Sequence, residues 1–170
     1  MNPDDKGIVE IATLEAPAQA ALRVLNNAHA RETSHLGPDE WDGLIAQAAA
    51  AWAMEDLAAL LLAFDEAAVY DSPNFLWFRK RFDRFLYVDR VIVKAEARGR
   101  GRARRLYGAL AALARRTGRP RLVAEVNRVP PNPVSDAFHA ALGFEEVGRG
   151  EPVPGKVVRY LAWPLPPLGA

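Results

Sequence analysis

The 170-residue chain contains no cysteine, which excludes a disulfide framework, a thiolate metal site and a cysteine nucleophile. It also has almost no net charge: 22 Lys and Arg residues against 21 Asp and Glu give +1, so we expect no global attraction to nucleic acid or to anionic membranes. No apolar run reaches the roughly 18 uncharged residues that a membrane-spanning helix needs. Residues 1–6 lack the basic start and apolar stretch of a signal peptide, and we therefore expect a cytoplasmic protein.

Hydrophobic periodicity and turn residues indicate the order of the secondary structure elements. Only the strand–helix–strand unit within residues 85–126 requires a parallel strand pair, because the other strands can be joined as antiparallel neighbours. We expect a single domain over residues 1–170 with an α/β fold, in which a mixed, mostly antiparallel central sheet of six to seven strands is flanked by about four helices. The expected strands lie near residues 8–11, 48–54, 57–64, 85–93, 122–126, 145–148 and 156–163; the helices begin near residues 17, 38, 102 and 134; residues 70–74 form a loop, and residues 164–170 a loose tail.

The segment from Arg98 to Ala103 has the composition of an anion-binding loop between a strand and a helix. Gly99 permits a positive φ, Gly101 leaves room for a ligand against the backbone, and Ala103 keeps the first helical turn close to the sheet. The free N–H groups of that turn and the helix dipole favour a negative charge. Arg98, Arg100 and Arg102 add guanidinium donors, and a pyrophosphate suits such a donor set.

This segment resembles the signature of the GNAT superfamily of N-acetyltransferases, Gln/Arg-x-x-Gly-x-Gly/Ala, through Arg98, Gly101 and Ala103. A second match runs from Asn132 to Phe144 and ends in Leu-Gly-Phe, like the family's final helix motif. The resemblance covers about the last 90 residues well and extends to a bacterial subgroup of predicted acetyltransferases. It implies the GNAT fold, acetyl-CoA as co-substrate, and direct attack of an amine on the thioester in a ternary complex.

Three residues are candidates for the proton transfers that the resemblance implies, because a base must take a proton from an alkylammonium and an acid can protonate the leaving thiolate. Asp89 shares a strand face with Val93, and the alternative for it is an ion pair with Arg90 or another arginine. Glu125 can act as the base or can bind the substrate ammonium as a fixed charge. His139 stands where the family commonly has a tyrosine acid; alternatively, it fills the pocket wall while solvent protonates the thiolate.

Other residues are candidates for holding the coenzyme. By the resemblance, the strand around Val91, Ile92 and Val93 pairs with the pantetheine arm and polarises the thioester carbonyl through backbone N–H groups. Asn127, Asn132 and Ser135 are expected near the pantetheine or the end of the coenzyme, although turn and cap roles also suit these residue types.

The amine acceptor is expected at two polar segments, residues 29–35 and 70–77. The candidate residues are His29, Glu32, Tyr70, Asp71 and Asn74, while Asp-Ser-Pro-Asn at 71–74 is also an ordinary turn sequence. The spacing of His29, Glu32 and His35 fits no standard metal site, so we expect none.

Two alternatives to an enzyme remain open from the sequence. One is a non-catalytic sensor domain that binds acyl-CoA. The other is an arginine-rich nucleic-acid-binding module, against which stand the balanced charge and the absence of aromatic residues between the arginines. For the enzyme we expect a small-molecule or peptide amine as acceptor and no nucleic acid partner; the terminal strands and Trp163 would permit a homodimer.

Overall fold

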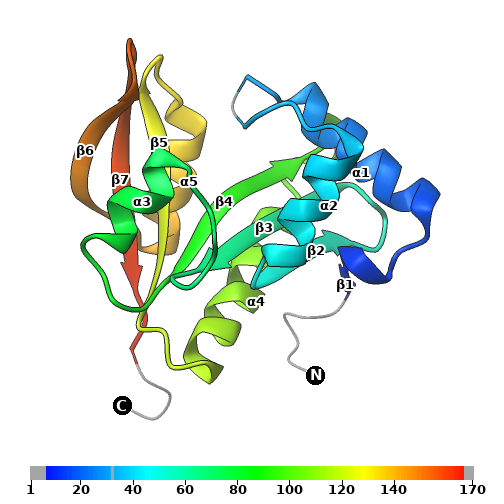
Figure 1. The fold of residues 1–170 in the computed structure, drawn as a ribbon, viewed down its shortest axis with the longest axis horizontal. Coiled ribbons are helices and arrows are strands. Elements are labelled where there is room, and N and C mark those ends of the chain that lie inside the picture. Colours follow the sequence, from blue (N-terminus) through cyan, green and yellow to red (C-terminus); the bar gives the residue numbers. More distant parts are fainter. Residues whose placement is uncertain (1–6, 32, 167–170) are drawn as a thin grey trace. The chain divides into compact units, whose positions relative to one another are not determined.

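The computed structural model describes residues 7–31 and 33–166 (Figure 1). Seven strands, in the order β1-β2-β3-β4-β5-β7-β6, and five α-helices are present in these residues, which confirms the mixed, mostly antiparallel α/β fold. In chain order, the elements are β1 Ile8–Glu10, η2 Ile11–Thr13, α1 Ala16–Ala28, α2 Pro38–Gln47, β2 Ala50–Met54, β3 Ala59–Asp65, α3 Pro73–Arg79, β4 Leu86–Val93, η3 Ala95–Ala97, α4 Arg102–Arg116, β5 Arg121–Val129, α5 Pro133–Leu142, β6 Glu145–Val153 and β7 Lys156–Pro164.

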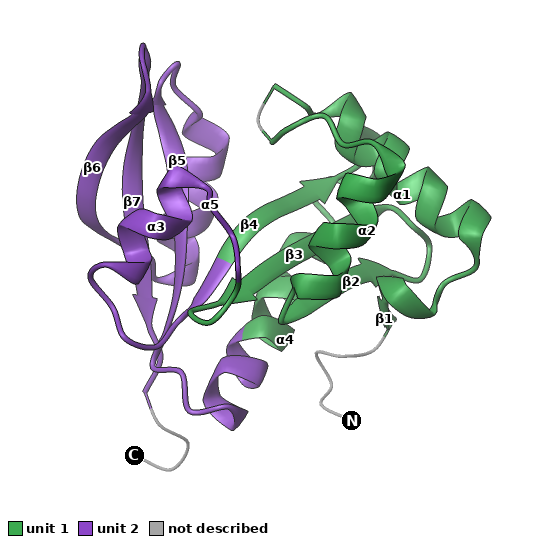
Figure 2. Cartoon of the chain, in the orientation of Figure 1, with its two compact units in different colours: residues 1–68, 88–110 green, residues 69–87, 111–170 purple. Residues whose placement is uncertain are grey.

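The chain divides into two compact units, coloured separately in Figure 2. Unit 1 comprises residues 1–68 and 88–110, and unit 2 comprises residues 69–87 and 111–170. The division falls within β4 and α4, so each of these two elements belongs partly to unit 1 and partly to unit 2.

Unit 1 contains an antiparallel arrangement in which β1 pairs with β2 and β2 pairs with β3. The apolar side of α1, with Leu22 and Leu25, packs with Trp41 of α2 into a buried cluster. Leu60 and Leu62 of β3 and Ile92 of β4 belong to the same cluster, so the core of this unit ties both helices to the strand that precedes the arginine and glycine segment.

Unit 2 contains β5, β7 and β6 as antiparallel neighbours, and the first residues of β4 pair with β5 in parallel, as the strand–helix–strand unit requires. Its core is aromatic: rings of α3, β4 and β7 pack at centroid distances of 5.3–5.8 Å. Gly143 ends α5 with φ of 103°, the left-handed conformation that favours glycine.

Three expectations about local structure were wrong. The segment after Tyr70 is not only a loop, because α3 begins at Pro73 and supplies a fifth helix. The strand β6 runs on to Val153, where the sequence indicated a connection. The tail is not loose at its start, since Leu165 is buried and its N–H donates to the Pro120 carbonyl at 2.8 Å.

None of the helices in the part of the chain that the structure describes is both long and apolar enough to cross a membrane.

Candidate functional site

The strongest candidate for an anion site lies in unit 1, between β4 and α4. After Val93 the chain forms the short helix η3, and Gly99 and Gly101 then take φ of 72° and 73° directly before α4 begins. A Cβ atom built on either glycine meets nothing within 4 Å, so the backbone is open on this side. The first N–H groups of a helix have no partner in the preceding turn, and the first turn of α4 carries no acidic residue. This donor set fits a pyrophosphate.

The three arginines of this segment differ in their surroundings. Arg100 is exposed, as is Arg98, whose guanidinium donates to the Val93 carbonyl at 3.4 Å. Arg102 instead binds the hairpin turn between β2 and β3: its Nε donates to Asp56 at 3.2 Å and its Nη1 to the Ala97 carbonyl at 3.1 Å. The hydrogen bond from Arg102 lowers the pKa of Asp56 below its ordinary value. The Arg102 side chain therefore stabilises the loop. Its backbone N–H lies in the first turn of α4 and is the group of Arg102 that can donate to a bound anion.

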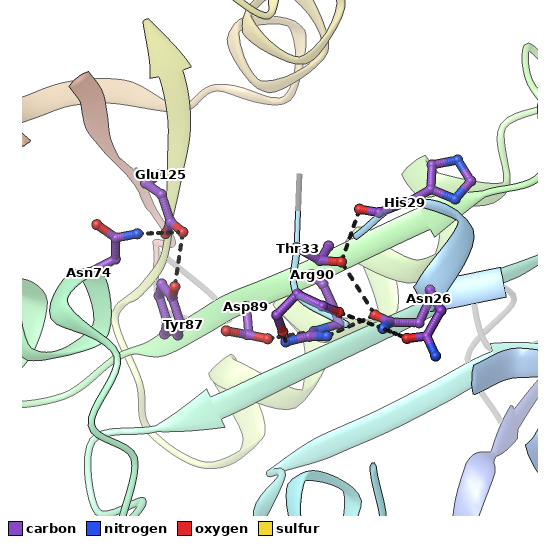
Figure 3. Close-up of polar contacts among 10 residues, drawn as sticks. Asn26, His29, Thr33, Asn74, Tyr87, Asp89, Arg90 and Glu125 are labelled. Carbon is purple, nitrogen blue, oxygen red and sulfur yellow. Dashed lines mark hydrogen bonds and ion pairs between the residues drawn. The ribbon is translucent and has the colours of Figure 1, made fainter. Parts of the chain in front are cut away.

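Asp89 lies on β4 in a buried charged cluster (Figure 3). Its Oδ2 accepts from Arg90 Nε at 2.6 Å, and both side chains are nearly inaccessible, at 6% and 3% exposure. Arg90 also donates to Asn26 Oδ1 at 2.7 Å, at the end of α1. The ion pair that the sequence left as one alternative for Asp89 is thus present. Val91, Ile92 and Val93 follow on the same strand, with Ile92 buried and the two valines partly buried.

The loop between α1 and α2 is held by side chains of the helix end. Asn26 Nδ2 donates to the Ser34 carbonyl at 2.9 Å, and Asn27 both donates to and accepts from the backbone of Leu36. His29 Nδ1 lies 3.1 Å from the Leu25 carbonyl, which can only accept, so Nδ1 carries the proton and Nε2 accepts from Arg98 Nη2 at 3.4 Å. The structure thus brings His29 and Arg98 together; Glu32 lies outside the described residues.

A second carboxylate, Glu125 of β5, is the centre of a polar cluster in unit 2 (Figure 3). Its Oε1 accepts from Asn74 Nδ2 of α3 at 3.0 Å and from the Tyr87 hydroxyl of β4 at 3.1 Å. The Tyr160 hydroxyl of β7 donates to Asn74 Oδ1 at 3.1 Å. Burial, with the charge of Glu125, raises the pKa of Tyr160, which keeps this hydroxyl protonated as a donor. Glu125 and Asn74, expected in separate roles, are therefore direct partners.

The first turns of α5 in unit 2 hold three further candidates. Asn132 is the N-cap, and its Oδ1 accepts from the Ser135 N–H at 3.2 Å. His139 is buried, and its Nδ1 lies 2.8 Å from the Ser135 carbonyl, so Nδ1 carries the proton in the neutral ring. Burial lowers the pKa of His139, which makes the doubly protonated ring scarce at neutral pH. In this state Nε2 has no proton to give, so the neutral ring cannot act as an acid through Nε2.

The remaining described candidates are Asn127, Asp71 and Tyr70. Asn127 of β5 pairs with Val158, and its carbonyl accepts from the Asn132 N–H at 3.2 Å. Asp71 is exposed, and Tyr70 packs against Phe75 with a centroid distance of 5.7 Å. Within residues 7–31 and 33–166, no group of three or more His, Asp or Glu residues is arranged to hold a metal ion.

Sequence reasoning missed Tyr87 as a partner of Glu125, Tyr160 as the partner of Asn74, and Asp56 as the partner of Arg102. The sequence did contain an indication for Tyr87, because the alternation of the strand places it on the same face as Asp89. The helix α3 had one as well: Ser72 followed by Pro73 is a common helix start, and Phe75 and Phe78 are three residues apart. Tyr160 can be recognised as a neighbour of Glu125 only once the register of β5 and β7 is known.

Comparisons with known proteins point to one family. Residues 25–144 match the family model described as Acetyltransferase (GNAT) family. No curated protein matches the chain in sequence. Among solved structures, similar folds include the NatC complex bound to Gag peptide and CoA (TM-score 0.69, 14% identity, 94% of this chain and 99% of that one). Two others are the ribosomal-protein-S18-alanine N-acetyltransferase from Escherichia coli (0.62, 17%, 95% of each chain) and YncA from Salmonella typhimurium with its cofactor acetyl-CoA (0.63, 18%, 96% and 95%). At these identities the likeness concerns the fold.

Proposed function

Since the chain belongs to the acetyltransferase (GNAT) family, we propose that it transfers the acetyl group of acetyl-CoA to a primary amine by direct attack in a ternary complex. The observation that carries this proposal is the open backbone at Gly99 and Gly101 immediately before the first turn of α4. The solved structures of similar fold with CoA or acetyl-CoA support the same donor. The acceptor is a small molecule or a peptide, and the protein works in the cytoplasm.

The residues of unit 1 bind the coenzyme. The backbone N–H groups at the start of α4, with the Arg98 and Arg100 guanidinium groups, bind the pyrophosphate as charge-assisted hydrogen-bond donors. Backbone groups of Val91, Ile92 and Val93 pair with the pantetheine arm. A role of Asn127, Asn132 and Ser135 in coenzyme binding stays a prediction from the family resemblance.

Acetyl-CoA, when bound, would supply an activated thioester. The neutral amine nitrogen would form a bond to the acyl carbon, the C–S bond would break with its electron pair on sulfur, and the nitrogen would lose its remaining extra proton to solvent. The protein must first remove a proton from the ammonium of the acceptor, which is protonated at neutral pH. We assign this step to Glu125, acting directly or through water. Its Oε1 accepts from two neutral donors, whereas Asp89 is engaged in an ion pair with the buried guanidinium of Arg90. The thiolate takes its proton from solvent.

Two variants separate these assignments. Glu125→Gln should lower kcat by about 10²- to 10⁴-fold, the usual contribution of a general base, while CoA affinity is retained. Asp89→Asn should leave Arg90 as a buried charge without its carboxylate, so it should lower Tm and retain turnover at temperatures where the protein is folded. Equal loss of kcat in both variants would contradict the choice of Glu125.

The direct test of the proposal combines binding with turnover. Acetyl-CoA should raise Tm by mass action, and a panel of amino acids, polyamines, aminoglycosides and peptides should then release free CoA thiol. Thiol reagents report CoA cleanly because the protein has no cysteine. No Tm shift at millimolar acetyl-CoA would refute the proposal, and binding without thiol release from any amine would indicate a sensor domain.

A further inference from the structure

Four polar side chains from four elements of unit 2 form one hydrogen-bonded cluster. Glu125 and Tyr160 are direct cross-strand neighbours in β5 and β7, Tyr87 comes from the parallel neighbour β4, and Asn74 comes from the second position of α3. Tyr87, Tyr160 and Asn74 are 1%, 2% and 9% exposed. Buried polar groups are costly unless they are hydrogen-bonded, so the cluster has to form as a whole.

The direction of each hydrogen bond follows from the groups involved. An ionised carboxylate only accepts, so Asn74 must turn its NH₂ group to Glu125 and leave its carbonyl oxygen for Tyr160. Tyr160 therefore donates to Asn74, and Asn74 and Tyr87 both donate to Glu125 Oε1. Tyr160 fixes the orientation of the Asn74 amide, and the amide fixes the carboxylate.

The helix that supplies Asn74 is itself held firmly. Trp77 stacks on the Tyr160 ring at 4.0 Å and 17°, and Arg81 lies over the same indole at 3.8 Å. The strand β6 makes room for this stack, because a Cβ on Gly148 would lie 2.4 Å from the Trp77 ring. These contacts of Trp77 hold α3 against Tyr160, and they thereby fix the position of Asn74 on the same helix.

We propose that Asn74, oriented by Tyr160, is a positioning residue that acts through Glu125: it holds the carboxylate in one rotamer and donates a hydrogen bond to its charged form, which receives a protonated alkylamine. This inference rests on the proposed function, because it assumes that Glu125 receives the amine. Neutral donors stabilise the negative charge without cancelling it, so the carboxylate still attracts a cation. Acceptors that carry no positive charge, such as arylamines, should consequently be poorer substrates.

The test compares Asn74→Leu and Tyr160→Phe with a control on the same helix, Phe78→Leu. Phe78 is buried and packs on the Tyr160 ring at 5.3 Å, and its side chain has no polar atom, so its variant changes packing alone. Losing a hydrogen bond to a charged group should lower kcat/KM for the amine about 10- to 100-fold in Asn74→Leu. The acid limb of the pH profile should move to higher pH, because the ionised carboxylate loses a donor. Tyr160→Phe should show a smaller change of the same kind, and CoA affinity should stay unchanged.

Asn74→Asp adds a like charge beside Glu125 at almost the same shape, and it should move the acid limb further than Asn74→Leu does. Phe78→Leu should lower Tm without moving the acid limb of the pH profile. The positioning role is refuted if the limb in Asn74→Leu stays where it is in the wild type, or if Phe78→Leu moves it as far.

Failure of the proposed function is distinguishable from failure of this inference. If the wild type acetylates no amine, the titration of the Glu125 carboxylate can still be followed by carbon-13 NMR of labelled protein. A titration that moves to higher pH in Asn74→Leu supports the positioning of Glu125 by Asn74, and an unchanged titration refutes it.

Discussion

The anion-binding role of the segment before α4 can be tested by adding a single methyl group at Gly101. Its φ of 73° is unfavourable for any residue with a Cβ, and the cost of this conformation is about 1–2 kcal/mol. The new Cβ would meet nothing within 4 Å, so Gly101→Ala should cost no more than this strain. For a chain of this length, that corresponds to a drop in Tm of about 2–8 °C.

Gly155 in the turn between β6 and β7 offers a matched control. Its φ is 81° and its built Cβ also meets nothing within 4 Å, so Gly155→Ala carries the same strain away from the proposed coenzyme site. The two variants should therefore lose similar stability. They should differ only when CoA is present, because the methyl group at residue 101 occupies the space proposed for the pyrophosphate.

The assay is a thermal melt with and without CoA, paired with calorimetric titration. At about 100 times Kd, CoA should stabilise the wild type and Gly155→Ala by about 2.7 kcal/mol, and a tenfold weaker site in Gly101→Ala should give only about 1.4 kcal/mol. Pantetheine, which lacks the pyrophosphate, should bind all three proteins alike. The reasoning is refuted if Gly101→Ala binds CoA as tightly as Gly155→Ala does.

Three further predictions concern the ion pair of the loop, the buried histidine and the packing of α3. Arg102 lowers the pKa of Asp56, so the stabilisation by this pair is present above the ordinary value of 3.8 and is lost as the pH falls through the folded-state value. Because Asp56 is 48% exposed, Asp56→Asn should cost about 0–1 kcal/mol near pH 7 and nothing in strong acid, as melts at both pH values would show; a larger cost in acid would contradict this. Burial lowers the pKa of His139, so the unfolded chain binds a proton more readily and stability should fall as the pH drops below about 6.5. His139→Phe should remove that part of the Tm-against-pH curve while leaving the pH dependence of kcat unchanged. If the variant lost one limb of the kcat-against-pH profile, His139 would be the general acid. Gly148→Ala forces its Cβ into the Trp77 ring and should cost about 1–3 kcal/mol by overpacking. The Trp77→Leu background should relieve much of that cost in a double-mutant cycle, and additive costs would show that the two sites do not interact.

The sequence predicted the segment from residue 85 to residue 103 well, because each step there has a strong local cause. The alternation along β4 separates the buried Arg90 and Ile92 from the partly buried residues that flank them on the strand. The two glycines then require a break before the helical spacing of α4 begins. Local causes of this kind are readable without knowing the fold.

The helix α3 was missed because its start competes with a turn. Asp-Ser-Pro-Asn favours a turn in isolation, and a helix of seven residues has too few repeats to show its periodicity. Its stability comes from contacts with distant segments, such as the stack of Trp77 on Tyr160. Tertiary contacts therefore override the local preference here.

The clusters around the two carboxylates could not be derived from spacing alone. Glu125 meets a residue 51 positions earlier in Asn74, and Arg90 meets Asn26 across 64 positions. For both Glu125 and Asp89, the sequence identified the carboxylate as a candidate but did not show which of its two possible roles applies. The partners became visible only with the strand register and the helix ends in place.

The most direct test of the central claim is a single-turnover reaction followed by mass spectrometry of both the protein and the amine. The protein is mixed with acetyl-CoA, quenched before and after an accepted amine is added, and the location of the acetyl group is determined. Direct transfer predicts that the protein is never acetylated, that the amine gains the acetyl group, and that Glu125→Gln slows this gain without weakening acetyl-CoA binding. An acetylated protein that forms before the amine is added, and then passes its acetyl group on, would contradict the account.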